Sequence, residues 1–196
     1  MQFSGGIWNN KSLIKVLKDG GVVVMPTDTI YGVVGRAKNS DTVERIYKLR
    51  KRNPKKPCII LVGSLDELEK FGISLNKEQK KVFKKYKPVP TSFILDCSES
   101  PFCEKFSYLH RGTKTLAFRL PTQEGLRNLL LETGPLIAPS ANIEGEEPSH
   151  TITEAKEYFT NKHADLVDLY IDSGEIISIP SKIIRLYNSG SVYIIR

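Results

Sequence analysis

A dense group of basic residues lies in the first third of the sequence. Seven arginines and lysines fall within the twelve positions from 45 to 56, with no acidic residue among them. They are Arg45, Lys48, Arg50, Lys51, Arg52, Lys55 and Lys56. Converging guanidinium and ammonium groups can hold a polyanion, and arginine adds bidentate geometry toward phosphate oxygens. The same composition suits the solvated C-terminal end of a helix, so charge density alone leaves both interpretations open.

Two further segments place hydroxyl and amide groups beside apolar, strand-like runs. Pro26–Gly32 reads PTDTIYG, and its two threonines could present hydroxyls to a small polar ligand. Ala138–Asn142 reads APSAN and puts Ser140 and Asn142 in a tight turn after an apolar run. Ligands in open α/β sheets bind where strands end, although a turn that satisfies its own backbone groups uses the same residue types. The basic cluster and the serine–asparagine turn together predict a shared pocket for a phosphorylated nucleotide.

Several catalytic motifs are missing from the sequence. It contains no P-loop, no dinucleotide-binding fingerprint and no nucleophile elbow, and its three histidines are dispersed. Cys58, Cys97 and Cys103 form no C-x-x-C pair, which favours buried thiols in a reducing compartment over a redox or zinc site. We therefore expect no protein-held metal. An enzyme of this composition would act by positioning substrates and stabilising charge rather than through a covalent intermediate.

Size and composition are typical of a soluble globular protein. The 196 residues, 40% of them hydrophobic and 26% charged, predict a single domain over residues 1–196. No apolar run is long enough to span a bilayer, and residues 1–6 do not resemble a signal peptide, so we expect a cytoplasmic protein. The net charge of +7 indicates an anionic partner, and charge alone leaves nucleotide, nucleic acid and acidic membrane open. The lysine-rich run 77–87 is typical of a solvated helix face.

The elements that must position these residues alternate along the chain. Helical patterns cover residues 12–18, the segment that follows a capping-box signal at 41–44, and residues 64–70, 76–86, 123–131 and 153–159. Strand patterns cover residues 22–25, which Pro26 ends, and residues 58–62, 92–95, 115–120, 135–138, 166–171, 182–186 and 192–195. This alternation predicts an α/β domain with a mixed sheet and leaves the strand order undetermined.

Five motifs stand in the order seen in the YrdC-like family, which the chain resembles from about residue 20 to residue 196. They are PTDTIYG at 26–32, the Arg50-x-Arg52 pair, TLAFRLP at 115–121, APSAN at 138–142 and Pro180-Ser181. The resemblance implies a twisted, open mixed sheet flanked by helices, with a concave, positively charged face. It also implies a single-domain bacterial threonylcarbamoyl-AMP synthase. Such enzymes condense L-threonine, bicarbonate and ATP, and they release pyrophosphate. A separate threonylcarbamoyl-transfer complex then modifies an adenosine of tRNA.

The resemblance further implies roles for individual residues. The positions that hold threonine would be Thr29, Arg119, Ser181 and the backbone near Ala138. The ATP-binding positions would be Arg52, Lys56, Thr115, Ser140, Asn142, Ser149 and Arg196. The catalytic set would be Arg50, Arg52, Ser140 and Asn142. A carbamate formed from threonine and bicarbonate would attack the α-phosphate, while basic groups and the Mg²⁺ that accompanies ATP stabilise the spreading negative charge.

Some residues depart from the family pattern. Arg50 stands where the signature normally has lysine, Val89 replaces a glycine, and Arg185 lies within the usual S-T-V-V-D segment. These departures leave open a YciO-like paralogue without synthase activity, although such paralogues lack the pair formed here by Ser140 and Asn142. An RNA-binding module, whose basic face contacts tRNA or another RNA directly, is a second alternative. A carbamoyl-transfer domain of a larger chain is a third.

Overall fold

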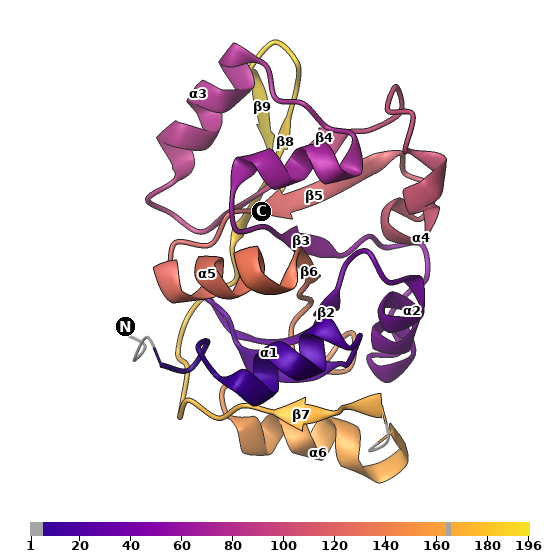
Figure 1. The fold of residues 1–196 in the computed structure, drawn as a ribbon, viewed down its shortest axis with the longest axis vertical. Coiled ribbons are helices and arrows are strands. Elements are labelled where there is room, and N and C mark those ends of the chain that lie inside the picture. Colours follow the sequence, from indigo (N-terminus) through magenta and orange to yellow (C-terminus); the bar gives the residue numbers. More distant parts are fainter. Residues whose placement is uncertain (1–5, 164–165) are drawn as a thin grey trace.

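A nine-stranded mixed sheet runs through the protein, with strand order β7-β1-β2-β6-β3-β5-β4-β8-β9 (Figure 1). The computed structural model describes residues 6–163 and 166–196. The strands are β1 (Val23–Pro26), β2 (Tyr31–Arg36), β3 (Ile59–Leu61), β4 (Thr91–Asp96), β5 (Thr115–Arg119), β6 (Leu136–Ile137), β7 (Leu169–Tyr170), β8 (Lys182–Leu186) and β9 (Val192–Ile194). The pairs β1–β7, β3–β5 and β4–β8 are parallel, and the others are antiparallel. The predicted α/β fold with a mixed sheet is confirmed.

Helices flank both faces of this sheet (Figure 1). They are α1 (Lys11–Lys18), α2 (Ser40–Leu49), α3 (Lys77–Tyr86), α4 (Ser107–His110), α5 (Glu124–Thr133) and α6 (Ile152–His163), with 3₁₀ helices η1 (Leu65–Phe71) and η2 (Glu104–Phe106). Successive side chains of a strand point to opposite faces. Val23 and Met25 of β1 accordingly pack in one apolar cluster with α1 and α5, whereas Val24 packs in another with α2 and α6.

The hairpin of β1 and β2 differs from the sequence prediction. Pro26 is the last residue of β1, where it pairs with Tyr31 at the start of β2, a strand that the sequence did not predict. Thr27 closes the turn between them, because its Oγ1 donates a hydrogen bond of 2.7 Å to the carbonyl of Ile30. β2 escaped prediction because it contains two glycines, which are depleted in strands. One of them, Gly35, is required by packing, since a Cβ there would lie 2.4 Å from the Thr42 side chain of α2.

Two predicted helix features are corrected locally. Helix α2 begins at Ser40, and its N-cap is Asn39, whose side-chain oxygen accepts a 3.1 Å hydrogen bond from the amide of Thr42. The capping box predicted at 41–44 was therefore wrong, because Asn39 and not Asp41 caps the helix. Asparagine is one of the most favourable N-cap residues. Residues 65–71 form a 3₁₀ helix that ends at Gly72, rather than the predicted α-helix.

Three further expectations concern membrane-spanning segments, the cysteines and the N-terminus. Among the residues that the structure describes, no helix is long and apolar enough to cross a membrane. All three cysteines are buried, as predicted, and the Sγ atoms of Cys97 and Cys103 lie 3.4 Å apart. Residues 1–5, on which the expectation about a signal peptide largely depends, lie outside the described residues.

Candidate functional site

A cavity of about 630 Å³ brings together segments from the whole length of the chain. Its wall includes the turn after β1, the chain that follows α2, strands β3, β5 and β8, and the loop after β6. Its cationic lining residues are Arg50, Arg52, Lys56, Arg119, Arg185 and Arg196. Within the described part of the chain, Glu144 is the one acidic residue on this wall. The basic cluster and the serine–asparagine turn therefore face a common cavity with an excess of positive charge.

Arg50 connects the end of α2 to the serine–asparagine turn. Its Nε donates to the backbone carbonyl of Asn142 at 2.9 Å, and its Nη2 donates to Oδ1 of the same residue at 2.8 Å. The same Nη2 also lies 3.2 Å from Oγ of Ser140, whose hydroxyl in turn donates to Asn142 Oδ1 at 2.6 Å. Only 3% of Arg50 is exposed. Burial lowers the pKa of its guanidinium to about 10, with the positive charge of Arg52 acting in the same direction. Arg50 thus holds the shape of the turn.

Strand β2 supports the same turn from its other side. The amide of Val33 donates to the carbonyl of Pro139 at 2.9 Å, and the amide of Ala141 donates to the carbonyl of Tyr31 at 2.9 Å. These bonds extend the pairing of β2 beyond β6 into residues 138–141, where Gly32 and Ser140 form an isolated antiparallel bridge. Backbone hydrogen bonds on one side and a buried guanidinium on the other restrict the orientation of the turn.

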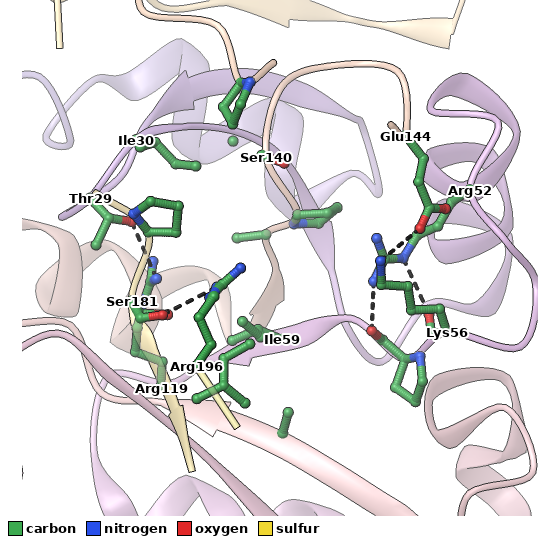
Figure 2. Close-up of a pocket in the computed structure, with 18 of the residues that line it drawn as sticks. Thr29, Ile30, Arg52, Lys56, Ile59, Arg119, Ser140, Glu144, Ser181 and Arg196 are labelled. Atoms are coloured by element: carbon green, nitrogen blue, oxygen red, sulfur yellow. Dashed lines mark hydrogen bonds and ion pairs between the residues drawn. The ribbon is translucent and has the colours of Figure 1, made fainter. Parts of the chain in front are cut away.

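Arg52, Lys56 and Glu144 form one polar end of the cavity (Figure 2). The Nε and Nη2 of Arg52 donate to the carbonyls of Lys56 and Pro57, at 3.2 Å and 2.7 Å. The Nζ of Lys56 lies 2.9 Å from Glu144 Oε1. Burial alone would raise the pKa of Glu144, but hydrogen bonds from Lys56 and from the amide of Asn53 hold that pKa below its usual value. Glu144 is therefore ionised at neutral pH.

A second polar end lies across the cavity and contains Thr29, Arg119, Ser181 and Arg196 (Figure 2). Nη1 of Arg119 donates to Thr29 Oγ1 at 3.3 Å, and its Nη2 lies 2.9 Å from Asp28 Oδ1. Nη2 of Arg196 donates to the carbonyl of Ser181 at 3.1 Å. Burial lowers the pKa of Arg119, while the charge of Asp28 opposes this shift. The Nε of Arg119 is buried without a hydrogen-bond partner in the structure.

Most of the residues that the sequence identified lie on this one wall. Those that line the cavity are Thr29, Arg50, Arg52, Lys56, Thr115, Arg119, Ala138, Ser140, Asn142, Ser181 and Arg196. Ser149 does not line it. The hydroxyl of Ser149 is buried and donates to the backbone carbonyl of Ala141, so this geometry gives no support to its predicted ATP contact.

Two acidic residues of the site were not predicted. Asp28 contacts Arg119, and its position between the two threonines of PTDTIYG is a signal that could have identified it. Glu144 contacts Lys56 across 88 positions of sequence, and no local pattern indicates that pairing. The described residues contain no group of three or more histidine, cysteine, aspartate or glutamate side chains that could hold a metal ion.

Comparison with known proteins decides the family. The model of the Sua5, YciO and YrdC family, described as "Telomere recombination", matches residues 15–196. The chain belongs to this family. The resemblance inferred from the five motifs is thereby confirmed, as is the mixed sheet flanked by helices that it implied.

Curated relatives of this Sua5, YciO and YrdC family member carry the name threonylcarbamoyl-AMP synthase. The protein from Pyrococcus abyssi is 29% identical over 181 residues, which cover 91% of this chain and 51% of the relative. The protein from Bacillus subtilis is 32% identical over 140 residues, covering 71% and 39%. A protein from Methanocaldococcus jannaschii, named a putative synthase, is 32% identical over 176 residues, covering 89% and 78%. The chain thus spans about half or less of the first two relatives.

Solved structures of other members agree with this fold. Sua5 of P. abyssi complexed with L-threonine superposes with a TM-score of 0.77 at 27% identity, covering 95% of this chain and 52% of that one. YciO of Escherichia coli superposes with a TM-score of 0.78 at 23% identity, covering 98% and 89%. The second likeness shows the fold alone.

Proposed function

We propose that this protein is an ATP-dependent threonylcarbamoyl-AMP synthase, which joins L-threonine, bicarbonate and ATP within the cavity and releases pyrophosphate. The observation that carries the proposal is the division of the cavity into two cationic ends. One end contains Arg52 and Lys56, and the other contains the buried Arg119 beside Thr29. The apolar residue Ile59 lies between them. Such an arrangement suits a polyphosphate and a small carboxylate bound side by side.

The end built around Arg119 is the proposed threonine site. A guanidinium binds a carboxylate bidentately, and burial strengthens that attraction because little water competes. The ion pair with Asp28 and the contact with Thr29 hold the guanidinium in one orientation. The complex of the related Sua5 protein with L-threonine supports L-threonine as a ligand.

The end built around Arg52 and Lys56 is the proposed triphosphate site. The amine of threonine and bicarbonate first form a carbamate and water. One carbamate oxygen then attacks the α-phosphorus in line, and the bond from that phosphorus to the pyrophosphate leaving group breaks. Negative charge spreads over the phosphate oxygens in this step, so preorganised cations lower its barrier. Ser140 and Asn142, held by Arg50, provide polar groups on the wall between the two ends.

The residues present fit a magnesium ion that arrives with the nucleotide. Mg²⁺ in such sites is usually held by phosphates, by waters and by only one or two carboxylates. Glu144 offers one carboxylate of this kind on the wall. When bound, the ion would neutralise charge on the phosphates. In the cell, we propose that the product passes to a separate transfer complex that modifies tRNA.

The test is to incubate the purified protein with ATP, Mg²⁺, bicarbonate and labelled L-threonine, and to look for threonylcarbamoyl-adenylate and pyrophosphate. Arg52→Ala and Ser140→Ala should each weaken ATP binding by at least about tenfold, whereas Lys48→Ala, an exposed member of the same basic cluster, should not. ATP binding without product would favour the YciO-like paralogue. An RNA-binding module would lose tRNA affinity at Arg52 and be insensitive to Ser140.

A further inference from the structure

Glu144 places a negative charge at the end of the cavity that is otherwise built for anions. Within the described residues it is the one acid on a wall that carries five arginines and a lysine. Its Oε1 lies 2.9 Å from Lys56 Nζ, and its Oε2 accepts a 2.5 Å hydrogen bond from the amide of Asn53. Figure 2 shows its carboxylate directed at Arg52 and Lys56. In the absence of ligand, the carboxylate thus holds the ammonium group that a phosphate would contact.

This placement has an electrostatic consequence for any polyphosphate that enters. A phosphate oxygen on Lys56 must either displace Glu144 or lie within a few ångströms of its carboxylate. Like charges repel strongly at such distances where water is partly excluded. Metal-free ATP carries about two more negative charges than its magnesium complex, because the bound cation is the largest local charge. The repulsion therefore falls mainly on the metal-free nucleotide.

We propose that Glu144 makes the cavity select the metal-complexed nucleotide over the metal-free polyphosphate. The inference rests on the proposed function, since it assigns the Arg52 and Lys56 end to phosphates. A carboxylate beside a triphosphate repels bare phosphate oxygens, and it attracts a divalent cation bound to them, directly or through a water molecule. Glu144 is in this sense a specificity-determining residue.

A purely structural role for Glu144 gives a different expectation. Its carboxylate also ties the loop after β6 to the chain after α2, through Asn53 and Lys56. Loss of this tie would weaken both forms of the nucleotide equally. The backbone provides a further tie that no side-chain change removes, because the amide of Glu144 donates to the carbonyl of Arg50 at 2.9 Å. The substitution Glu144→Gln removes the charge and keeps one oxygen acceptor, which can serve either Asn53 or Lys56 but not both.

The experiment is isothermal titration calorimetry of the full chain with ATP, once in excess Mg²⁺ and once in excess EDTA, at matched ionic strength because salt screens the effect. We expect the wild type to bind Mg·ATP more tightly than metal-free ATP. Glu144→Gln should reduce that preference by about five- to tenfold, chiefly by strengthening the binding of metal-free ATP. Glu147→Gln removes the same charge from an exposed position of the same loop that does not line the cavity, and it should leave the preference unchanged.

The outcomes separate this inference from the proposed function. A Glu144→Gln protein that retains the wild-type preference, or that loses affinity for both forms equally, would overturn the inference while leaving the nucleotide site in place. A wild-type protein that binds neither form would overturn the proposed function and the inference together. A thermal melt of each variant confirms that the compared proteins are folded.

Discussion

The guanidinium of Arg50 holds Asn142 by both its backbone carbonyl and its side-chain oxygen, at 2.9 Å and 2.8 Å, across 92 positions of sequence. This contact joins the basic cluster to the serine–asparagine turn. Arg50, the buried member of the cluster, supports the serine–asparagine turn, while Arg52 and Lys56 form one polar end of the cavity. One run of basic residues therefore has two structural roles.

Removing this support should destabilise the turn and the protein. Arg50→Ala leaves the backbone carbonyl of Asn142 without its donor, and leaves Oδ1 with the Ser140 hydroxyl alone, which costs about 2–4 kcal/mol of the free energy of unfolding. Urea denaturation measures this loss, and Lys48→Ala on the exposed face of α2 is the control. An Arg50→Ala protein as stable as the control would show that the contact contributes nothing.

Asp28 should act on threonine binding through Arg119. Asp28→Asn keeps an acceptor for the amide of Thr122 but removes the ion pair with Arg119, whose guanidinium is then less restrained. We expect L-threonine affinity to fall by at least about tenfold, and ATP affinity to stay within about twofold. Calorimetry with each ligand measures the two changes in affinity separately. Equal losses for both ligands would indicate general damage to the cavity instead.

For Ser149, the resemblance to the family and the structure of this chain give different expectations about ATP binding. Its hydroxyl is buried and donates to the carbonyl of Ala141, and Ser149 does not line the cavity. Ser149→Ala should therefore lower the free energy of unfolding by about 1 kcal/mol and leave ATP affinity within about twofold. A large loss of ATP affinity with unchanged stability would restore the role that the resemblance implied.

The pH dependence of stability should report the charge on Glu144. Because its pKa in the folded protein is depressed, the folded state binds fewer protons there than the unfolded state. The stabilisation is present above the ordinary value of 4.5 and is lost as pH falls through the folded pKa. The difference in Tm between the wild type and Glu144→Gln should therefore shrink as the pH is lowered below that value. A difference that stays constant through this range would contradict the assigned charge.

The three thiols should resist modification while the protein is folded. Cys58, Cys97 and Cys103 are each at most 5% exposed, and burial raises the pKa of Cys97 to about 12. A thiol reagent at pH 8 should label none of them in the native protein, because the thiolate is the reactive form. All three should react once the protein is unfolded. Rapid labelling of the native chain would show that the region around β4 opens readily.

Sequence reasoning predicted the elements whose patterns are local. The apolar runs that became β3, β5 and β8 and the amphipathic α3 carry their own signals, and the ordered motifs identified the family. Strand β2 was missed because its two glycines serve tertiary packing, where Gly35 lets Thr42 approach. The strand propensity of a residue contains no information about such a tertiary contact.

The charges within the site were harder to predict than the elements. Arg50 and Arg52 are two positions apart, look alike in the sequence and both line the cavity, yet Arg50 is buried against Asn142 whereas Arg52 donates to the carbonyls of Lys56 and Pro57. Glu144 became part of the site only because folding places its loop beside Lys56. Interactions of this kind depend on long-range contacts, which the spacing of residues along the chain does not encode.

The most direct test of a single cavity for both substrates is a crystal structure with L-threonine and a non-hydrolysable ATP analogue in Mg²⁺. We predict the threonine carboxylate on Arg119 and the phosphates at Arg52 and Lys56, with the contact between Lys56 and Glu144 broken or shared. Density for either ligand outside this cavity, or phosphates bound away from both Arg52 and Lys56, would contradict the proposed synthase site.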